Sequence, residues 1–282
     1  MNISFFARPY FLAVDPSISA EPALARLAGL VRGEQMADYL GGKYNPESGF
    51  ENDLKIYIKP KTLDNITDDD YIDVSDAGDY LIELLKKRPK IKLIASSVVL
   101  FEYLKEKLIN EIYFIPEHHC NFERVKRVRS EMTTAGFVGA PSLLNFAAND
   151  KITKELEKIG VEFKTYYYFK NRQDVINFYK QIDLLIVADF DWIDDSEAYR
   201  HPTKLISAAS FGIPAIARWK IGYSEFEGNY IPVNSMESLI AEVEKMKNKD
   251  YYDALAKKII AAAEPYNIEH IAKLYRQLKV KT

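Results

Sequence analysis

Short apolar runs alternate with amphipathic helical patterns along almost the whole chain. Strand-like runs, rich in β-branched and aromatic residues, lie at 3–7, 54–58, 71–74, 91–95, 112–115, 136–139, 161–168, 183–187, 213–217 and 230–233. Helical periodicity occupies residues 23–40, 77–87 and 98–108, and it returns from near residues 149, 172 and 203. Such alternation is typical of mostly parallel sheets with helices on both faces, so the sequence predicts an α/β protein.

The rhythm breaks once, at residues 116–134, which we interpret as a linker between two Rossmann-like units. Two further helical segments close the chain, and Pro265 interrupts the second of them. We expect the last piece to cross back to the first unit. The predicted organisation is an N-terminal domain at 1–120, a C-terminal domain at 133–264, and a helix at 265–282 that packs on the N-terminal domain.

Composition narrows the functional classes. The chain has 282 residues, 48% of them hydrophobic, which is enough for two ordinary cores. A net charge of −3, from 38 basic and 41 acidic residues, gives no general attraction to nucleic acid. The single cysteine, Cys120, indicates neither a disulfide scaffold nor a zinc site. The apolar start reads as a buried strand rather than a signal peptide, and no apolar run reaches about 18 residues, so a cytoplasmic protein is expected.

The segment 201–217 has the most chemical content. Thr203 is placed to cap a helix whose positive dipole end faces outward, and Lys204 adds a cation at the same end. Residues 212–214, Gly-Ile-Pro, end the helix before a buried strand. A helix start at the carboxyl edge of a parallel sheet binds phosphates well, so we predict a pyrophosphate site that includes His201 and Ser207. The alternative is an ordinary capped helix.

Small residues follow the first strand of the second unit. Gly139 and Ser142 would lie at the same sheet edge, where a glycine allows the backbone to approach a phosphate or a sugar closely. Arg172 lies near this edge and could neutralise a phosphate. A plain turn at 139–142 is the alternative reading.

These residues resemble a known family. The run 204–217, preceded by the strand 183–187, is similar to the donor-binding segment of GT-B glycosyltransferases of the retaining group 1 type, with the form K-L-x-E-A-x-x-x-G-x-P-x-I-A. Residues 115–119 resemble the hinge of this family, and residues 71–95 resemble its N-domain pattern. The resemblance implies two Rossmann-like domains that face each other across a cleft, with no metal and no cofactor. It also implies a UDP- or GDP-linked sugar donor in the C-terminal domain and a saccharide or lipid-linked acceptor in the N-terminal domain.

The chain departs from this family at one point. Retaining members carry a pair of glutamates eight positions apart, and the matching residues here are Tyr199 and Ser207. A glycosyltransferase of cell-surface polysaccharide or glycoconjugate synthesis is the leading hypothesis. The alternative is a non-catalytic GT-B-like protein that binds nucleotide sugars or acts as a scaffold. A nucleotide-sugar epimerase is a third reading, and it needs carboxylates that the sequence does not place.

Two residues are candidates for catalysis. His118 lies at the expected hinge, where an imidazole could move a proton near pH 7. Asp76 follows the third strand and would point, with Asp73, toward the cleft. The plain readings are a hydrogen-bonding linker histidine and a helix cap at Asp76.

Three other features carry open alternatives. The basic residues Arg124, Lys126, Arg127 and Arg129 could meet a lipid-linked acceptor at the inner membrane face, or they could simply be solvated. Arg32, near a break in the first helical pattern, could contact a phosphate or lie on a solvated face. The acidic loop at 189–195 could bind magnesium, or its Trp192 could stack on a base or sugar ring; the family resemblance favours no metal.

Overall fold

The structure is a computed structural model that describes residues 2–7, 28–75, 79–139, 146–167, 171–188 and 201–278. The described residues divide into two compact units. The first unit holds the chain up to His118, together with His201 and the residues from Ile268 onward. The second unit holds residues 119–188 and 202–267. Each unit has its own parallel sheet.

Within the described residues, the first unit has a six-stranded parallel sheet in the order β2-β1-β3-β4-β5-β6. The strands are Ile3–Ala7 (β1), Lys43–Tyr44 (β2), Leu54–Ile58 (β3), Tyr71–Asp73 (β4), Lys92–Ala95 (β5) and Ile112–Phe114 (β6). The helices are the π-helical stretch Ala28–Gln35 (η2), then Met36–Leu40 (α1), Asp79–Lys86 (α2), Val98–Lys107 (α3) and Ile268–Gln277 (α9).

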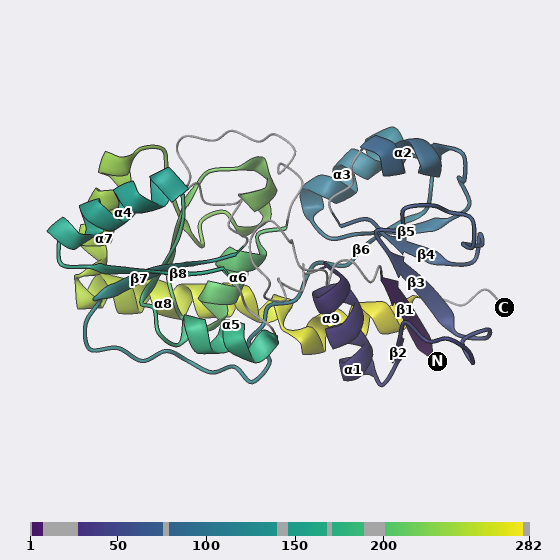
Figure 1. Cartoon of the computed structure of the whole chain (residues 1–282), viewed down its shortest axis with the longest axis horizontal. Coiled ribbons are helices and arrows are strands. Elements are labelled where there is room, and N and C mark those ends of the chain that lie inside the picture. Colours follow the sequence, from purple (N-terminus) through teal and green to yellow (C-terminus); the bar gives the residue numbers. More distant parts are fainter. Residues whose placement is uncertain are drawn as a thin grey trace. The chain divides into compact units, whose positions relative to one another are not determined.

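Helices cover both faces of this sheet (Figure 1). Helices α2 and α3 lie on one face, where Ile72, Leu85 and Leu100 belong to one buried apolar cluster. Helix α9 lies with α1 on the other face, where the ring of Tyr275 meets that of Phe5 edge-on at 5.6 Å. The last helix of the chain therefore completes the core of the first unit.

The second unit has a five-stranded parallel sheet, counted over the described residues, in the order β11-β10-β9-β7-β8. Its strands are Thr134–Val138 (β7), Glu162–Tyr166 (β8), Leu184–Val187 (β9), Ala215–Arg218 (β10) and Ile231–Val233 (β11). Its helices are Phe146–Lys158 (α4), Arg172–Tyr179 (α5), Thr203–Ser210 (α6), Met236–Met246 (α7) and Lys249–Ala263 (α8), with short 3-10 turns at Ile221–Phe226 (η5) and Glu264–Tyr266 (η6).

Helices α4 and α7 cover one face of the second sheet, and α5, α6 and α8 cover the other (Figure 1). Successive side chains of β9 point to opposite faces of the sheet. Leu184 and Ile186 belong to the apolar cluster under α4 and α7, while Leu185 is buried outside that cluster. Helix α6 ends at Ser210, and the chain then turns through Gly212, whose φ of 76° is left-handed. All but its first two residues are buried, so α6 is an internal element whose start is held in a fixed place.

The predicted α/β class is confirmed, and each predicted strand has a counterpart within a few residues. The sequence reading missed β2 because two residues are too short for a pattern to emerge. Pro265 marks the change from α8 to α9 as expected, since it lies in the turn η6 between them. Among the described residues, no helix has both the length and the apolar character that crossing a membrane requires.

Candidate functional site

The second sheet has a topological switch point between β7 and β9. The chain runs from β7 outward to β8, then returns past β7 to β9 and continues to β10 and β11. In open parallel sheets, ligands bind outside the carboxyl ends of the two strands where the order reverses. The carboxyl end of β7 is followed by Gly139, and the helix that comes after β9 is α6, with Lys204 in its first turn.

Gly139 and Lys204 lie together at this edge. A Cβ atom built on Gly139 would lie 2.8 Å from Cε of Lys204 and 3.1 Å from the ring of Phe137. Any side chain at position 139 would therefore push the lysine away. The amide of Gly139 donates to the carbonyl oxygen of Tyr166 over 3.1 Å, which fixes the glycine at the sheet edge. The structure thus brings together two residues that the sequence singled out separately.

The start of α6 differs from the prediction in one respect. Thr203 is the first helical residue, and Pro202 occupies the N-cap position without a side-chain hydrogen bond to the helix. The expectation that Thr203 caps the helix is wrong, because the helix begins one residue earlier than a Thr203 cap requires. Proline offers no side-chain acceptor to the first-turn amides. The Tyr179 hydroxyl donates to the carbonyl oxygen of Lys204 over 3.3 Å, so the first turn is tied to α5.

Ser207 is only 4% exposed. Its side chain lies near the half-buried Cys120 thiol and the Tyr179 hydroxyl, and it opposes the rise in the pKa of both groups. Burial raises the pKa of Cys120 to about 12, which the contact with Ser207 only partly offsets, and burial also raises the pKa of Tyr179. The cluster is therefore neutral at pH 7. At the position that matches a glutamate of the resembling family, this chain has the buried hydroxyl of Ser207; Tyr199, the other matching position, lies outside the described residues.

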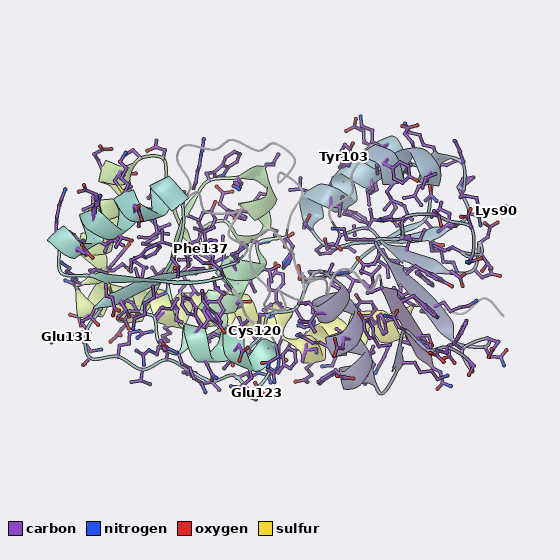
Figure 2. The ribbon with its side chains drawn as sticks, in the orientation of Figure 1. Lys90, Tyr103, Cys120, Glu123, Glu131 and Phe137 are labelled. Carbon is purple, nitrogen blue, oxygen red and sulfur yellow. The ribbon has the colours of Figure 1, made fainter. Side chains whose placement is uncertain are left out.

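Arg172 is held by the segment that precedes β7. Its guanidinium forms a two-point ion pair with Glu123, at 2.7 and 2.9 Å, and donates to the carbonyl oxygen of Cys120 over 2.8 Å. Its charged carbon also lies 4.0 Å from the ring centre of Phe122. Glu123 and Cys120 are labelled beside α5 (Figure 2). The Arg172 hydrogen bond lowers the pKa of Glu123, so the pair is charged at neutral pH. Arg172 therefore forms an internal ion pair here, and its contact with a phosphate stays a prediction.

His118 is 2% exposed, and its Nε2 lies 2.9 Å from the carbonyl oxygen of Val31. Because a carbonyl only accepts, Nε2 carries the proton in this contact. The arrangement suits a histidine that joins two segments of the first unit, and its catalytic role stays a prediction. His201, 8% exposed, comes just before Pro202. Asp76 and Ser142 lie outside the described residues, as does the acidic loop 189–195 with Trp192.

An ion pair in the first unit was not anticipated. Nε of Arg32 donates to Oδ2 of Asp73 over 2.7 Å, and the side chains are 1% and 0% exposed. Arg32 also donates to the carbonyl oxygen of Ile115 over 2.9 Å, and the Tyr275 hydroxyl lies 3.4 Å from the same carboxylate oxygen. Burial raises the pKa of Asp73, and the ion pair with Arg32 opposes this shift. The sequence singled out Arg32 and Asp73 separately and gave no sign that they pair.

The predicted basic cluster is mostly paired within the second unit. Arg124 forms a two-point ion pair with Glu264, with a closest contact of 2.7 Å. Arg129, whose side chain is 5% exposed, pairs with Asp183. The Asp183 carboxylate also accepts hydrogen bonds from the amides of Thr133 and Thr134, at 2.8 and 2.7 Å. These pairs fasten the segment before β7 to the rest of the second unit, and Arg124 and Lys126 are the exposed members of the cluster.

We compared the sequence and the fold with those of known proteins. No protein-family model matches the chain, and no curated protein matches its sequence. Among solved structures, the chain is similar to Alr3699/HepE from Anabaena, solved in complex with UDP-glucose, with a TM-score of 0.62, 10% identity, and coverage of 98% of this chain and 99% of that one.

Two other solved structures give the same result. A glycosyltransferase from Rickettsia africae ESF-5 aligns with a TM-score of 0.57 at 13% identity, over 98% of this chain and 97% of that one. TarM aligns with a TM-score of 0.53 at 12% identity over 82% of this chain, and the match spans only 51% of the TarM chain. At these identities the likeness concerns architecture alone. The chain therefore has the GT-B fold, with two Rossmann-like units, that these glycosyltransferase structures share.

Proposed function

We propose that this protein is a glycosyltransferase that moves a sugar from a nucleotide-sugar donor, UDP- or GDP-linked, to a saccharide-containing acceptor. The donor diphosphate binds in the second unit, at the switch point between β7 and β9. We further propose that the acceptor belongs to a cell-surface polysaccharide or glycoconjugate, a part that rests on the sequence resemblance alone.

One observation carries the donor assignment: the side chain of Lys204 lies against Gly139 at the carboxyl edge of the sheet. A cation, a position without a side chain and a helix start converge there. Each favours an anion, through charge, close backbone approach and the positive helix end respectively. The solved structure of Alr3699/HepE with UDP-glucose adds support, because that protein has the same fold over nearly its whole length.

The chemistry follows from what these groups stabilise. In glycosyl transfer, negative charge develops on the departing diphosphate as the bond to the sugar breaks. A lysine and helix-end amides fixed beside that group stabilise the transition state more than the ground state. The buried surroundings of α6 hold them in place before the substrate arrives. The chain supplies no glutamate at position 207, so diphosphate neutralisation bears most of the catalysis in this proposal.

A thermal-shift screen of UDP-, GDP-, CMP- and dTDP-sugars tests the donor assignment, because a ligand that binds only the native state raises Tm. We expect a UDP- or GDP-sugar to raise Tm, and we expect a smaller rise in Lys204→Ala. Lys154→Ala, which removes an exposed lysine of α4 in the same unit, serves as the matched control and should behave like the wild type. If no nucleotide sugar raises Tm, the proposal fails.

Turnover is a separate step. Release of nucleoside diphosphate from the donor that raises Tm, measured with a panel of saccharide acceptors, should depend on both donor and acceptor. Donor binding without turnover on any acceptor would contradict the transferase assignment and favour a binding protein.

A further inference from the structure

The first unit contains a cavity of about 520 Å³ between helix α2 and the loop at 59–70 that leads from β3 to β4. The loop contributes Thr62, Leu63 and Asp64 to its walls, and α2 with the turn after it contributes Tyr80, Leu84, Lys87 and Arg88. The volume is within the usual range of small-molecule sites, roughly 300 to 1,000 Å³. The candidate donor site lies in the second unit and has no part in this cavity.

Three hydrogen bonds join the two walls, near the start and near the end of both segments. The Tyr80 hydroxyl, early in α2, donates to the carbonyl oxygen of Lys61 over 3.1 Å. Just after α2, Nη2 of Arg88 donates to the carbonyl oxygen of Ile66 over 2.9 Å and to Oδ1 of Asp68 over 3.0 Å. The loop is thus fastened alongside the helix, and the cavity between them is formed before any ligand enters.

The floor of the cavity is apolar. Tyr80 and Leu84 are four residues apart on α2, so they share one face of the helix. Leu63, which is 7% exposed, belongs to the apolar cluster under α2, and the half-buried Leu84 packs against the same cluster. The ring of Tyr80 is 63% exposed and adds an aromatic surface at one end. A ligand with an apolar part can therefore cover these side chains.

Two opposite charges line this cavity without compensation. Within the described part of the chain, neither the Asp64 carboxylate nor the Lys87 ammonium has an ion-pair partner, and the two do not pair with each other. The cations on either side of Lys87 differ from it, because Lys86 and Arg88 each have an acidic partner, at 2.6 and 3.0 Å. The Thr62 hydroxyl likewise has no hydrogen-bond partner among the described residues.

This pattern of charge selects the class of ligand. A ligand in the cavity displaces water from both charged groups. An anion would pair with Lys87 and be repelled by Asp64, and a cation would do the reverse. A zwitterion compensates both groups at once, so it loses nothing to repulsion.

We propose that this cavity binds a free α-amino acid with an apolar side chain. The ammonium group of the ligand pairs with Asp64, its carboxylate pairs with Lys87, and its side chain lies against Leu63 and Leu84. Binding there does not depend on the donor assignment, because it concerns other residues and another chemical class of ligand.

Isothermal titration of the full chain with L-leucine and L-phenylalanine tests the proposal. Leucinamide, which keeps only the ammonium group, and N-acetylleucine, which keeps only the carboxylate, are the comparison ligands. We expect at least one of the two amino acids to bind. Both comparison ligands should bind about 10-fold or more weakly than leucine, the loss expected when one charged hydrogen bond is missing.

Two variants assign each charge of the ligand to its partner. Asp64→Asn should weaken leucine binding about 10-fold or more and abolish the preference for leucine over N-acetylleucine. Lys87→Met should weaken leucine binding similarly and abolish the preference for leucine over leucinamide. Both side chains are exposed, so Tm without ligand should match that of the wild type.

Lys90→Met and Asp38→Asn are the matched controls, because both remove an exposed charge of the first unit outside the cavity lining; Lys90 is labelled in Figure 2. Both controls should bind leucine like the wild type. The proposal is overturned if neither amino acid binds, if leucinamide or N-acetylleucine binds as tightly as leucine, or if the controls lose as much affinity as the cavity variants.

Discussion

The two units differ in how a cationic side chain is placed near the carboxyl edge of the sheet. In the second unit, Lys204 is half-buried at a helix start, and its side chain lies against Gly139. In the first unit, Arg32 is enclosed and neutralised by Asp73 at a strand end. If Lys204 receives the donor diphosphate as proposed, the same architecture uses a cation in one unit to bind an anionic ligand and in the other to hold its own elements together. The two cations differ in burial: the Arg32 side chain is 1% exposed, whereas Lys204 is half-buried.

The largest expected effect comes from breaking the enclosed pair. Asp73→Asn leaves the Arg32 guanidinium buried without its counter-charge, which typically costs about 3–5 kcal/mol of stability. Urea unfolding should show this loss as a lower midpoint. A loss of stability below about 1 kcal/mol would contradict the burial of the Arg32–Asp73 pair, because exposed ion pairs contribute no more than that.

Two glycines, Gly136 in the middle of β7 and Gly139 just after it, give a second contrast. A Cβ atom at Gly136 would lie 2.5 Å from Cγ2 of Ile182, so Gly136→Ala should destabilise the second unit by about 1–3 kcal/mol through overpacking. Gly139→Ala meets mainly the flexible end of Lys204 and should change stability less. It should instead weaken donor binding several-fold. Isothermal titration and urea unfolding of both variants check this, and the reverse pattern would contradict the site.

A smaller effect is expected at Arg172. If its guanidinium serves the ion pair with Glu123, a double-mutant cycle of Arg172→Ala and Glu123→Ala should give a coupling of roughly 0.2–1 kcal/mol, because the pair is partly exposed. Donor affinity should change little in either variant. A tenfold loss of affinity in Arg172→Ala alone would restore its role in phosphate binding.

The ion pair of Arg172 and Glu123 also predicts that the stability of the protein depends weakly on pH. The Arg172 hydrogen bond lowers the pKa of Glu123 in the folded state. Its stabilisation is therefore present above the unfolded pKa and is lost as the pH falls through the lowered value. Urea midpoints of the wild type measured at decreasing acidic pH should fall more than those of Glu123→Gln. If the urea midpoints of the wild type and Glu123→Gln fall in parallel, Glu123 makes no pH-dependent contribution to stability.

The sequence predicted those parts of the fold that depend on local patterns. Alternation placed β3, and Pro265 located the junction before α9. The sequence could not predict ion pairs between residues that lie far apart along the chain. Nothing near Arg172 indicates that Glu123, 49 positions away, neutralises it. A one-residue shift at a helix start likewise moved Thr203 out of the cap, since pattern reading does not resolve helix ends that finely.

The sequence predicted the candidate donor site from two residue types, a small residue and a cation. Gly139 and Lys204 each stood out by residue type, and the parallel topology brought them to one edge. Arg32 and Asp73 were noticed one at a time, but only packing shows that they pair and that Tyr275 of the last helix joins them.

The central claim, a donor diphosphate beside Lys204, is tested most directly by isothermal titration of the nucleotide sugar that gives the largest Tm shift. We expect Lys204→Ala to bind it about 10-fold or more weakly, as for the loss of a charged hydrogen bond, with the same unfolding midpoint as the wild type. Lys154→Ala should bind like the wild type. Equal affinity in Lys204→Ala and the wild type would contradict the account.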